Sequence, residues 1–519
     1  MPNGVAARNG GRVGIAALVA ILLLGLGLRV GEAWDGRAPV FDAAAYAAIA
    51  RNLDEGNGFT VGAKATQPSD DYSPGLPLFV AGVYEVTGGV HERLAREVLA
   101  VIGALAPLFT YLIARRLADA LPTYASKRRG HPDACLPYVD KRRWGPVVAG
   151  LVAALAVAIY PATIQYTGML MTEPLAATLL AGAMLAIFWA GDGPRPGVAG
   201  APGDTYGPRD DNPGEPRSLW RWLVPGLTLG ALALVRPEYL AVGFLLALLI
   251  LLRERFASRS QKSPDSDEKC GRTRCGRWRR PVLTALVVVT GIVVVVAPWT
   301  VRNAFALHRF VSVSTGGGQV LYAGTYLPSD GNPEKVGAAV VAEHPELFGP
   351  HAVENLRLEQ ILARLGEHTY PGLEPDQALS KMGKEQLRDD IEHHTGEYIG
   401  FLAKKVGRIW SHGPRSVMRE PLWEALHWAL LGLGLLGLGL LLYLRRWEAL
   451  LIGAIFLAIT LISALLVASP RRVLVLIPLL AACAGTAVAW LAATARPGAP
   501  VPSYLPKRGR DGRADERVT

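Results

Sequence analysis

The chain is poor in the residues that build disulfide-stapled or zinc-bound folds. It has four cysteines and ten histidines in 519 residues. Cys270 and Cys275 could begin a zinc site, but no second pair follows them, so plain loop thiols are favoured. The thiols of the basic loops are also expected to be reduced, because such loops should face the cytoplasm.

Charged residues are also scarce. Charged residues make up 19% of the chain and hydrophobic residues 50%. The apolar residues gather in runs of about 20, the length that crosses a bilayer as a helix. The formal charge of +10 lies in short segments between these runs, as in inside-facing loops, so nucleic acid is not an expected partner. We expect an all-α polytopic membrane protein.

The apolar runs define the expected membrane spans. The clear ones are Val13–Leu28, Val98–Ala114, Pro146–Tyr160, Leu175–Ala190, Pro281–Ala297, Trp423–Leu444, Leu450–Ala468 and Val473–Leu491. Arg8 and Arg12 precede the first run as in a signal peptide, but no convincing cleavage site follows, so we expect an uncleaved helix.

The run Trp222–Leu252 could be one long span or two short ones, and the charge of the flanking loops decides between them. The segments Arg115–Arg143 and Arg253–Arg280 are both basic and should face the cytoplasm, so an even number of spans separates them. Trp222–Leu252 must then be a hairpin that turns at Arg236-Pro237, where proline breaks a helix. This gives about ten spans in the cell membrane, with both termini inside.

The same topology divides the chain into four parts. Residues 1–298 form a transmembrane core with a catalytic first external loop at 31–97. Residues 299–422 form a long external loop, and 423–493 form the last transmembrane helices. Residues 494–519, rich in Pro, Gly and Arg, are expected to be a disordered cytoplasmic tail. Within the long loop, apolar residues at helical spacing over Gln377–Trp410 predict one or two amphipathic helices.

Charged residues collect at the outer ends of the expected helices. They are Asp42, Asp70, Asp71, Glu173, Arg236, Arg302, Arg471 and Arg472. Carboxylates can act as general bases, and arginines bind phosphate with a fork of donors, so this face suits chemistry on a lipid phosphate. Each residue also has a plainer reading. Asp42 and Glu173 could cap helices. The four arginines could snorkel to the interface, and Asp70 and Asp71 could lie in an exposed turn.

The order of several motifs resembles the GT-C superfamily of membrane glycosyltransferases. The closest likeness is to the bacterial family 39 type, related to dolichyl-phosphate-mannose protein mannosyltransferases and lipid A aminoarabinose transferases. The motifs are Phe41–Tyr46, Ala50–Phe59, Tyr72–Phe79, Met171–Leu175, Leu234–Pro237, Pro298–Asn303, Ser314–Gly318, Leu321–Gly324 and Ser469–Arg471. The triplet Gly316–Gly318 has neither the lysine nor the context of a P-loop, which favours a flexible turn.

The resemblance implies a polyprenyl-phosphate-linked sugar donor and Asp42 as the key acid of the first external loop. Family members often carry Asp-Glu there, whereas this chain has Asp42-Ala43, so Glu173 is the candidate for the second carboxylate. Asp42 would orient or deprotonate the acceptor hydroxyl, with inversion at the sugar. The expected substrate-binding residues are Asp70, Asp71, Tyr72, Arg236, Arg302, Arg471 and Arg472. The acceptor could be a glycan, a lipid or a protein.

Two further expectations concern metals and rival functions. No cluster of metal ligands stands at fixed spacing, so we expect no required cofactor, although a divalent cation could bind at Asp70, Asp71 or Glu173. A transporter or flippase of lipid-linked substrates is the main alternative, but it would place ionisable residues within the spans. A structural subunit would leave Asp42 and the arginines individually dispensable.

Overall fold

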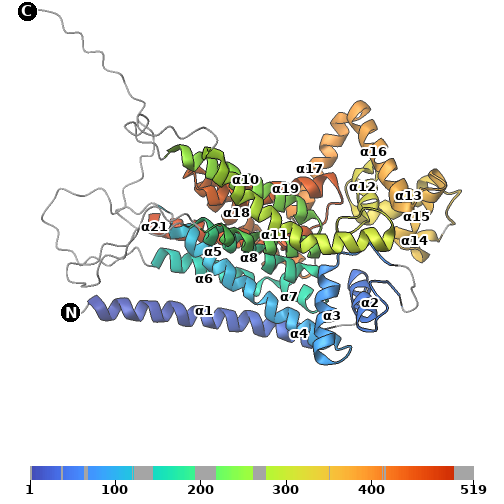
Figure 1. Ribbon diagram of the computed structural model, residues 1–519. Coiled ribbons are helices and arrows are strands. Elements are labelled where there is room, and N and C mark those ends of the chain that lie inside the picture. Colours follow the sequence, from blue (N-terminus) through green and yellow to red (C-terminus); the bar gives the residue numbers. More distant parts are fainter. Residues whose placement is uncertain are drawn as a thin grey trace, which may run out of the picture.

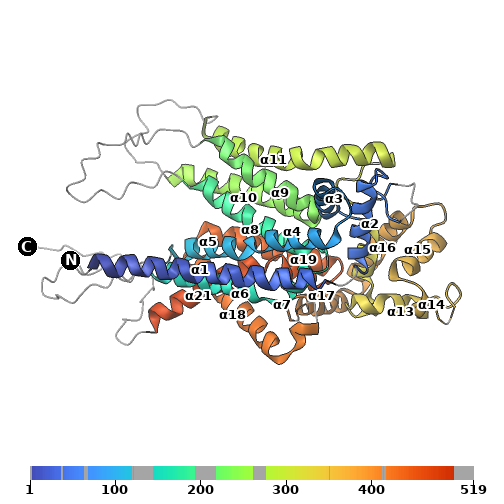
Figure 2. The same cartoon turned by 90° about the horizontal axis from the view of Figure 1, so that it is seen from below.

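The computed structural model describes residues 3–36, 39–62, 68–119, 121, 144–192, 218–260, 276–349, 351–411, 413 and 416–495. Within these ranges every regular element is a helix, as expected. The long helices form an elongated bundle, and shorter ones gather at one end of it (Figure 1). A second view, turned by 90°, shows the same division (Figure 2). The expected tail lies outside the described residues from 496 onward.

Seven spans of the bundle are long and apolar enough to cross a membrane. They lie in α1 (Asn3–Trp34), α4 (Glu92–Gly103) continued by α5 (Leu105–Asp119), α8 (Thr172–Gly191), α11 (Gly276–Leu307), α18 (Pro421–Tyr443), α19 (Trp447–Leu465) and α21 (Ile477–Thr494). An eighth is counted if α6 (Trp144–Ile159) and α7 (Pro161–Thr167), bent by 52°, form one broken span. The chain is thus a multi-pass helical membrane protein.

The run Trp222–Leu252 is broken where the charge pattern predicts. A 3-10 turn, η2 (Leu219–Trp222), leads into α9 (Leu223–Val235), and α10 (Glu238–Ser260) follows the break. Arg236 between them is extended (φ −144°, ψ 108°), because the following proline disfavours the helical region. The apolar stretch that ends with α9 is shorter than a full span, and α10 is not among the candidates, so the total of about ten stays a prediction.

The shorter helices form a region that we call the head. The first loop contributes the two juxtamembrane helices α2 (Asp42–Asp54) and α3 (Gly75–Thr87). The long loop contributes α12 (Gly317–Thr325), η4 (Leu327–Ser329), α13 (Pro333–Glu343), α14 (Ala352–Asn355), α15 (Leu358–Thr369), α16 (Pro375–His393) and α17 (Thr395–Ser411). The long loop has a buried core of its own, which includes Tyr322, Val336 and Leu365, whereas the buried residues of α2 and α3 belong to the core of the bundle.

Two features of the long loop bear on the site. The amphipathic segment Gln377–Trp410 forms two helices, α16 and α17, that meet at His394, which confirms the prediction. α11 runs through Pro298 to Leu307, so Arg302 lies on a helix rather than in a loop. The chain then returns by η5 (Ser416–Arg419) to α18, and the short α20 (Arg471–Leu474) links α19 to α21.

Candidate functional site

An arginine–carboxylate cluster lies where the bundle meets the head. Its members come from four places in the chain: Asp42 opens α2, Glu173 lies in the first turn of α8, Arg236 and Glu238 flank the α9–α10 break, and Arg471 and Arg472 open α20. We call these six residues the Arg471 cluster. The structure therefore brings together five residues that the sequence proposed separately, across sequence separations of up to 429 residues.

Arg471 bridges the two candidate catalytic carboxylates. Its Nε donates to Oε1 of Glu173 at 2.8 Å, and its Nη1 donates to Oδ2 of Asp42 at 2.9 Å. The two carboxylates raise the pKa of Arg471, against the opposing effect of burial. About a third of its side chain, 31%, stays exposed, so part of the guanidinium can meet a ligand. One fixed cation thus sets the separation of the two acids.

Glu173 is the buried centre of the cluster. Its side chain is 1% exposed, and Oε1 also accepts from Nη2 of Arg236 at 3.0 Å. Arg236 is held on its other two nitrogens, by Thr172 Oγ1 at 3.2 Å and Glu238 Oε1 at 3.1 Å. A buried charge is tolerated when it is paired and hydrogen-bonded in this way. Arg236 therefore acts on Glu173 and is not open to a substrate.

Asp42 is the accessible acid of the cluster. Its side chain is 39% exposed. It is the first residue of α2, whose N-cap is Phe41, and no side-chain cap bond is made there. The plainer reading of Asp42 as an N-cap is thus replaced by an ion pair. Phe41 has φ 53° and ψ −128°, a region that disfavours side chains, and such strain gathers at functional sites.

Two tyrosines line the same side of the cluster as Asp42. Tyr46 lies one turn further along α2, and its ring meets that of Tyr72 edge-on at 5.5 Å between centroids. Burial, with the charge of Asp42, raises the pKa of Tyr72 to about 12 and also raises that of Tyr46. Both phenols are therefore neutral at physiological pH and can donate hydrogen bonds to a sugar hydroxyl.

Asp70 and Asp71 belong to a second group. Asp70 Oδ2 pairs with Nη2 of Arg309 at 2.5 Å, and Asp71 Oδ1 accepts from Thr315 Oγ1 at 3.2 Å. Burial, and then the neighbouring Asp70, raises the pKa of Asp71. Arg302 lies with this group, since its Nη1 contacts Ser69 O at 3.4 Å. These contacts join Arg302 to the group of Asp70, and its part in substrate binding stays a prediction.

The remaining predicted positions are accounted for by local contacts. Arg472 donates from Nη1 to Val467 O at 2.6 Å, and its Nε lies 3.9 Å from Glu238 Oε1. Gly316 has φ 83° and caps α12. The backbone N–H of Gly318 then donates to Asp376 Oδ1 at 2.9 Å, so the glycine triplet starts a helix whose first donors are satisfied from α16.

Sequence reasoning missed three contributors to these groups. Tyr46 lies at i+4 from Asp42, so helical spacing could have identified it. Glu238 follows Arg236 by two residues across the break, and its only signal is this nearness in the sequence. Arg309 has no local signal, because its pairing with Asp70 depends on how the chain folds back after α11. Within the described residues, no three His, Cys, Asp or Glu side chains are grouped to hold a metal ion.

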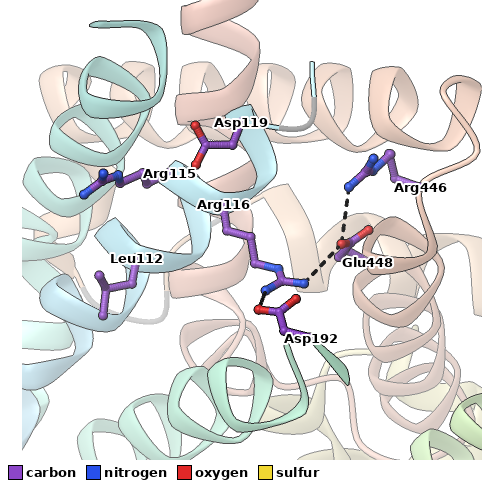
Figure 3. A pocket seen from close by; sticks show the side chains of 7 residues that line it. All are labelled: Leu112, Arg115, Arg116, Asp119, Asp192, Arg446 and Glu448. Atoms are coloured by element: carbon purple, nitrogen blue, oxygen red, sulfur yellow. Dashed lines mark hydrogen bonds and ion pairs between the residues drawn. The ribbon is translucent and has the colours of Figure 1, made fainter. Parts of the chain in front are cut away.

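The opposite end of the bundle holds a cavity of about 430 Å³. Its lining residues are Leu112, Arg115, Arg116, Asp119, Asp192, Arg446 and Glu448 (Figure 3). Arg116 pairs with Asp192 at 2.5 Å and with Glu448 at 3.6 Å, and Arg446 lies 3.5 Å from Glu448. We call this the Arg116 pocket. It contains none of the residues that the motifs single out.

These features define a multi-pass helical protein with a shared-carboxylate cluster at one end. No protein-family model and no curated protein matches the sequence. Among solved structures, the chain is similar to the Archaeoglobus fulgidus oligosaccharyltransferase in complex with zinc and sulfate, at 14% identity and a TM-score of 0.47. That match covers 92% of this chain and 49% of the other, so this chain spans about half the length of the archaeal protein.

A second similar structure is ArnT from Cupriavidus metallidurans bound to undecaprenyl phosphate. The identity is 14% and the TM-score 0.34, over 91% of this chain and 78% of the other. Both likenesses are distant.

Proposed function

We propose that the chain is a membrane glycosyltransferase that moves a sugar from a polyprenyl-phosphate donor to an acceptor hydroxyl at the Arg471 cluster. The observation that carries this proposal is the bridge by Arg471 between exposed Asp42 and buried Glu173. It sets an accessible carboxylate beside a partly exposed guanidinium, which suits an acceptor proton and a phosphate respectively. The donor class follows the motif resemblance.

The reaction is a direct displacement at the sugar C1. Asp42 takes the proton of the acceptor hydroxyl as its oxygen forms a bond to C1. The bond from C1 to the phosphate oxygen breaks, and its electron pair leaves on the polyprenyl phosphate. Arg471 stabilises that growing charge from its exposed side. Attack opposite the leaving group inverts the anomeric centre.

The other predicted residues take supporting roles in this proposal. Glu173 and Arg236 are positioning residues, because both are buried and act through Arg471. Tyr72 and the group of Asp70, Asp71 and Arg302 lie toward the head and would bind sugar or acceptor hydroxyls. Arg472 is the second arginine at the start of α20 and would assist with the phosphate.

The rival function is transport of a lipid-linked substrate. Transporters place ionisable groups near the middle of the spans, where they bind the substrate or a coupling ion. Arg29 is a buried charge on α1, 2% exposed. It donates to the carbonyls of Gly25, Val157 and Ala158 at 3.0 Å, so it is committed to the bend after α6 rather than to a transport path.

The test is transfer by the purified protein in nanodiscs. A panel of labelled polyprenyl-phosphate sugars is offered with membrane extract as acceptor. Asp42→Asn should lower the rate about 10²–10⁴-fold, the usual worth of a general base. Asp192→Asn is a matched control, because Asp192 is also paired with an arginine and its side chain is 40% exposed against 39% for Asp42.

Each outcome separates the candidate functions. Equal transfer by wild type and Asp42→Asn keeps the enzyme class but removes Asp42 as the base. If no sugar is transferred while the labelled lipids change leaflet in vesicles, the transporter is correct. Retained transfer in every variant of the Arg471 cluster would move the reaction elsewhere in the molecule.

A further inference from the structure

Lys405 is a buried amine that the proposed mechanism does not use. It lies on α17 and is 1% exposed, on the helix face that also buries Tyr398, Phe401 and Ile409. Its Nζ donates to Gly324 O at 2.6 Å and to Leu466 O at 2.5 Å. Gly324 belongs to α12 in the head, and Leu466 follows α19 in the bundle. One side chain thus ties three segments together.

The carbonyl of Leu466 lies at the start of the turn that presents the arginines. The turn 466–470 joins α19 to α20, whose first residues are Arg471 and Arg472. Lys405 holds the carbonyl of Leu466, and Arg472 holds the next one, that of Val467, at 2.6 Å. The first two carbonyls of the turn are therefore held by basic side chains, one from the head and one from α20.

The contact between the head and this turn is close. A Cβ on Gly324 would lie 2.5 Å from the carbonyl carbon of Leu466, so only glycine allows this approach. A Cβ on Gly331 would lie 2.6 Å from Cγ of Lys405, which shows that the lysine stem is packed as tightly as its amine. The side chain of Lys405 is therefore fixed in place by close packing, unlike that of a flexible surface lysine.

The charged groups around Lys405 favour its neutral form. Arg472 faces it from α20, while α12 and the turn present carbonyls, and the ring of Phe401 lies 4.9 Å from Nζ. The nearby Asp330 is paired with Lys404 at 2.7 Å. Burial, and then the charge of Arg472, lowers the pKa of Lys405 to about 7.

We propose that Lys405 is a positioning residue that fixes the head to the turn 466–470 and so sets the place of Arg471 between Asp42 and Glu173. The proposal rests on the proposed function, since it assigns Lys405 a part in placing the same arginine. A neutral amine has two protons for two carbonyls. Protonation would strengthen these two hydrogen bonds, but it places a second buried cation beside Arg472, and the repulsion between the two cations strains the turn that both side chains hold.

The sign of the pH effect follows from this pKa. The unfolded lysine binds its proton up to a pH of about 10.4, whereas the folded one releases it near 7. The unfolded state therefore holds more protons between these values, and stability rises with pH across that window. Transfer by wild type should also rise as pH increases through 7.

The experiment compares Lys405→Met with Lys405→Arg and with Lys404→Met as a matched surface control. Transfer kcat and KM are measured from pH 6 to 9, and hydrogen exchange is measured over residues 466–472. We expect Lys405→Met to lower kcat by up to about 100-fold with KM little changed, as a misplaced group does. It should also abolish the rise near pH 7 and speed exchange in the turn.

The variants distinguish positioning from general packing. Lys405→Arg keeps a charge at every pH, so it should lack the pH-dependent rise, while Lys404→Met should match wild type. Unchanged exchange in the turn, or a Lys405→Met kcat equal to that of wild type, overturns the proposal. If wild type transfers no sugar, the proposed function fails by itself, and the exchange data still decide whether Lys405 orders the turn.

Discussion

The Arg471 cluster and the Arg116 pocket contain the same charged groups in the same numbers. Each has three arginines and three carboxylates, and they lie at opposite ends of one bundle. In the Arg471 cluster, two arginines reach one buried oxygen of Glu173 at 2.8 and 3.0 Å. In the Arg116 pocket, the arginines stand 3.5 and 3.6 Å from Glu448. Composition alone does not separate a site from a structural network.

The placement of the charges does separate them. Arg116 lies in the last turn of α5 and Glu448 in the first turn of α19, where the helix dipole favours each sign. The Arg116 pocket is thus explained by helix-end electrostatics. Arg471 and Arg472 begin α20 instead, and under the predicted sidedness they run against the positive-inside bias. Neither the helix dipole nor the positive-inside bias explains these two arginines, and a functional role would.

The largest expected difference comes from replacing the central arginine at each end by lysine. Lysine keeps the charge but cannot reach two carboxylates with a planar fork. Arg471→Lys should lower transfer roughly 10²–10³-fold, as does loss of a donor that stabilises a growing negative charge. Arg116→Lys should leave the rate per folded molecule unchanged. Initial rates of transfer from a labelled donor measure both effects. A wild-type rate for Arg471→Lys would contradict the assignment of Arg471 as the group that stabilises the leaving phosphate.

The second comparison removes the buried acid at each end. Glu173→Gln leaves Arg236 and Arg471 without their shared counter-charge, which costs about 3–5 kcal/mol of stability for a broken buried pair. Glu448→Gln should cost less, because the side chains of Arg116 and Arg446 are 26% and 37% exposed and can turn to water. Thermal unfolding in detergent measures both.

The same two variants also differ in activity. Glu173→Gln should lower kcat about 10²-fold by displacing Arg471, whereas Glu448→Gln should not change it. A folded Glu173→Gln protein with normal kcat would show that the shared carboxylate serves stability alone. The Arg471 cluster and the Arg116 pocket would then both be structural networks.

Much of this architecture follows from patterns in the sequence. The apolar runs locate the long helices, and Pro237 predicts the break at Arg236 because proline acts on the residue before it. Asp42, Glu173 and Arg471 were expected on one face because each stands at a helix end. Which residues of that face would meet was not predictable, since Asp70, Asp71 and Arg302 were expected there too and have other partners.

Partner choice and buried charge could not be predicted in this way. Arg302 was predicted among the substrate-binding residues together with Arg471, but no pattern showed that α11 continues past Pro298 and carries Arg302 to the loop of Asp70. Lys405 was not predicted to be buried because lysine is rarely buried. Its place depends on two carbonyls from distant segments, which a helical pattern does not encode.

The smallest expected effect is that of metal removal. Within the part of the chain that the structure describes, no group of three potential ligands converges. Asp42 and Glu173 are instead neutralised by Arg471 and Arg236, which occupy the positions that a cation would take between them. We therefore predict that transfer is unchanged after treatment with EDTA and gel filtration.

The contacts of Asp70 and Asp71 show where a required cation would bind if this prediction were wrong. Asp70 is paired with Arg309, whereas Asp71 accepts a hydrogen bond from the hydroxyl of Thr315 and, because of burial and the neighbouring Asp70, has a raised pKa. A cation needed for the reaction would therefore act at Asp71, and Asp71→Asn would reproduce the effect of EDTA. Loss of transfer on chelation, restored by a single divalent cation in wild type but not in Asp71→Asn, would replace the arginine-only mechanism with a metal-assisted one.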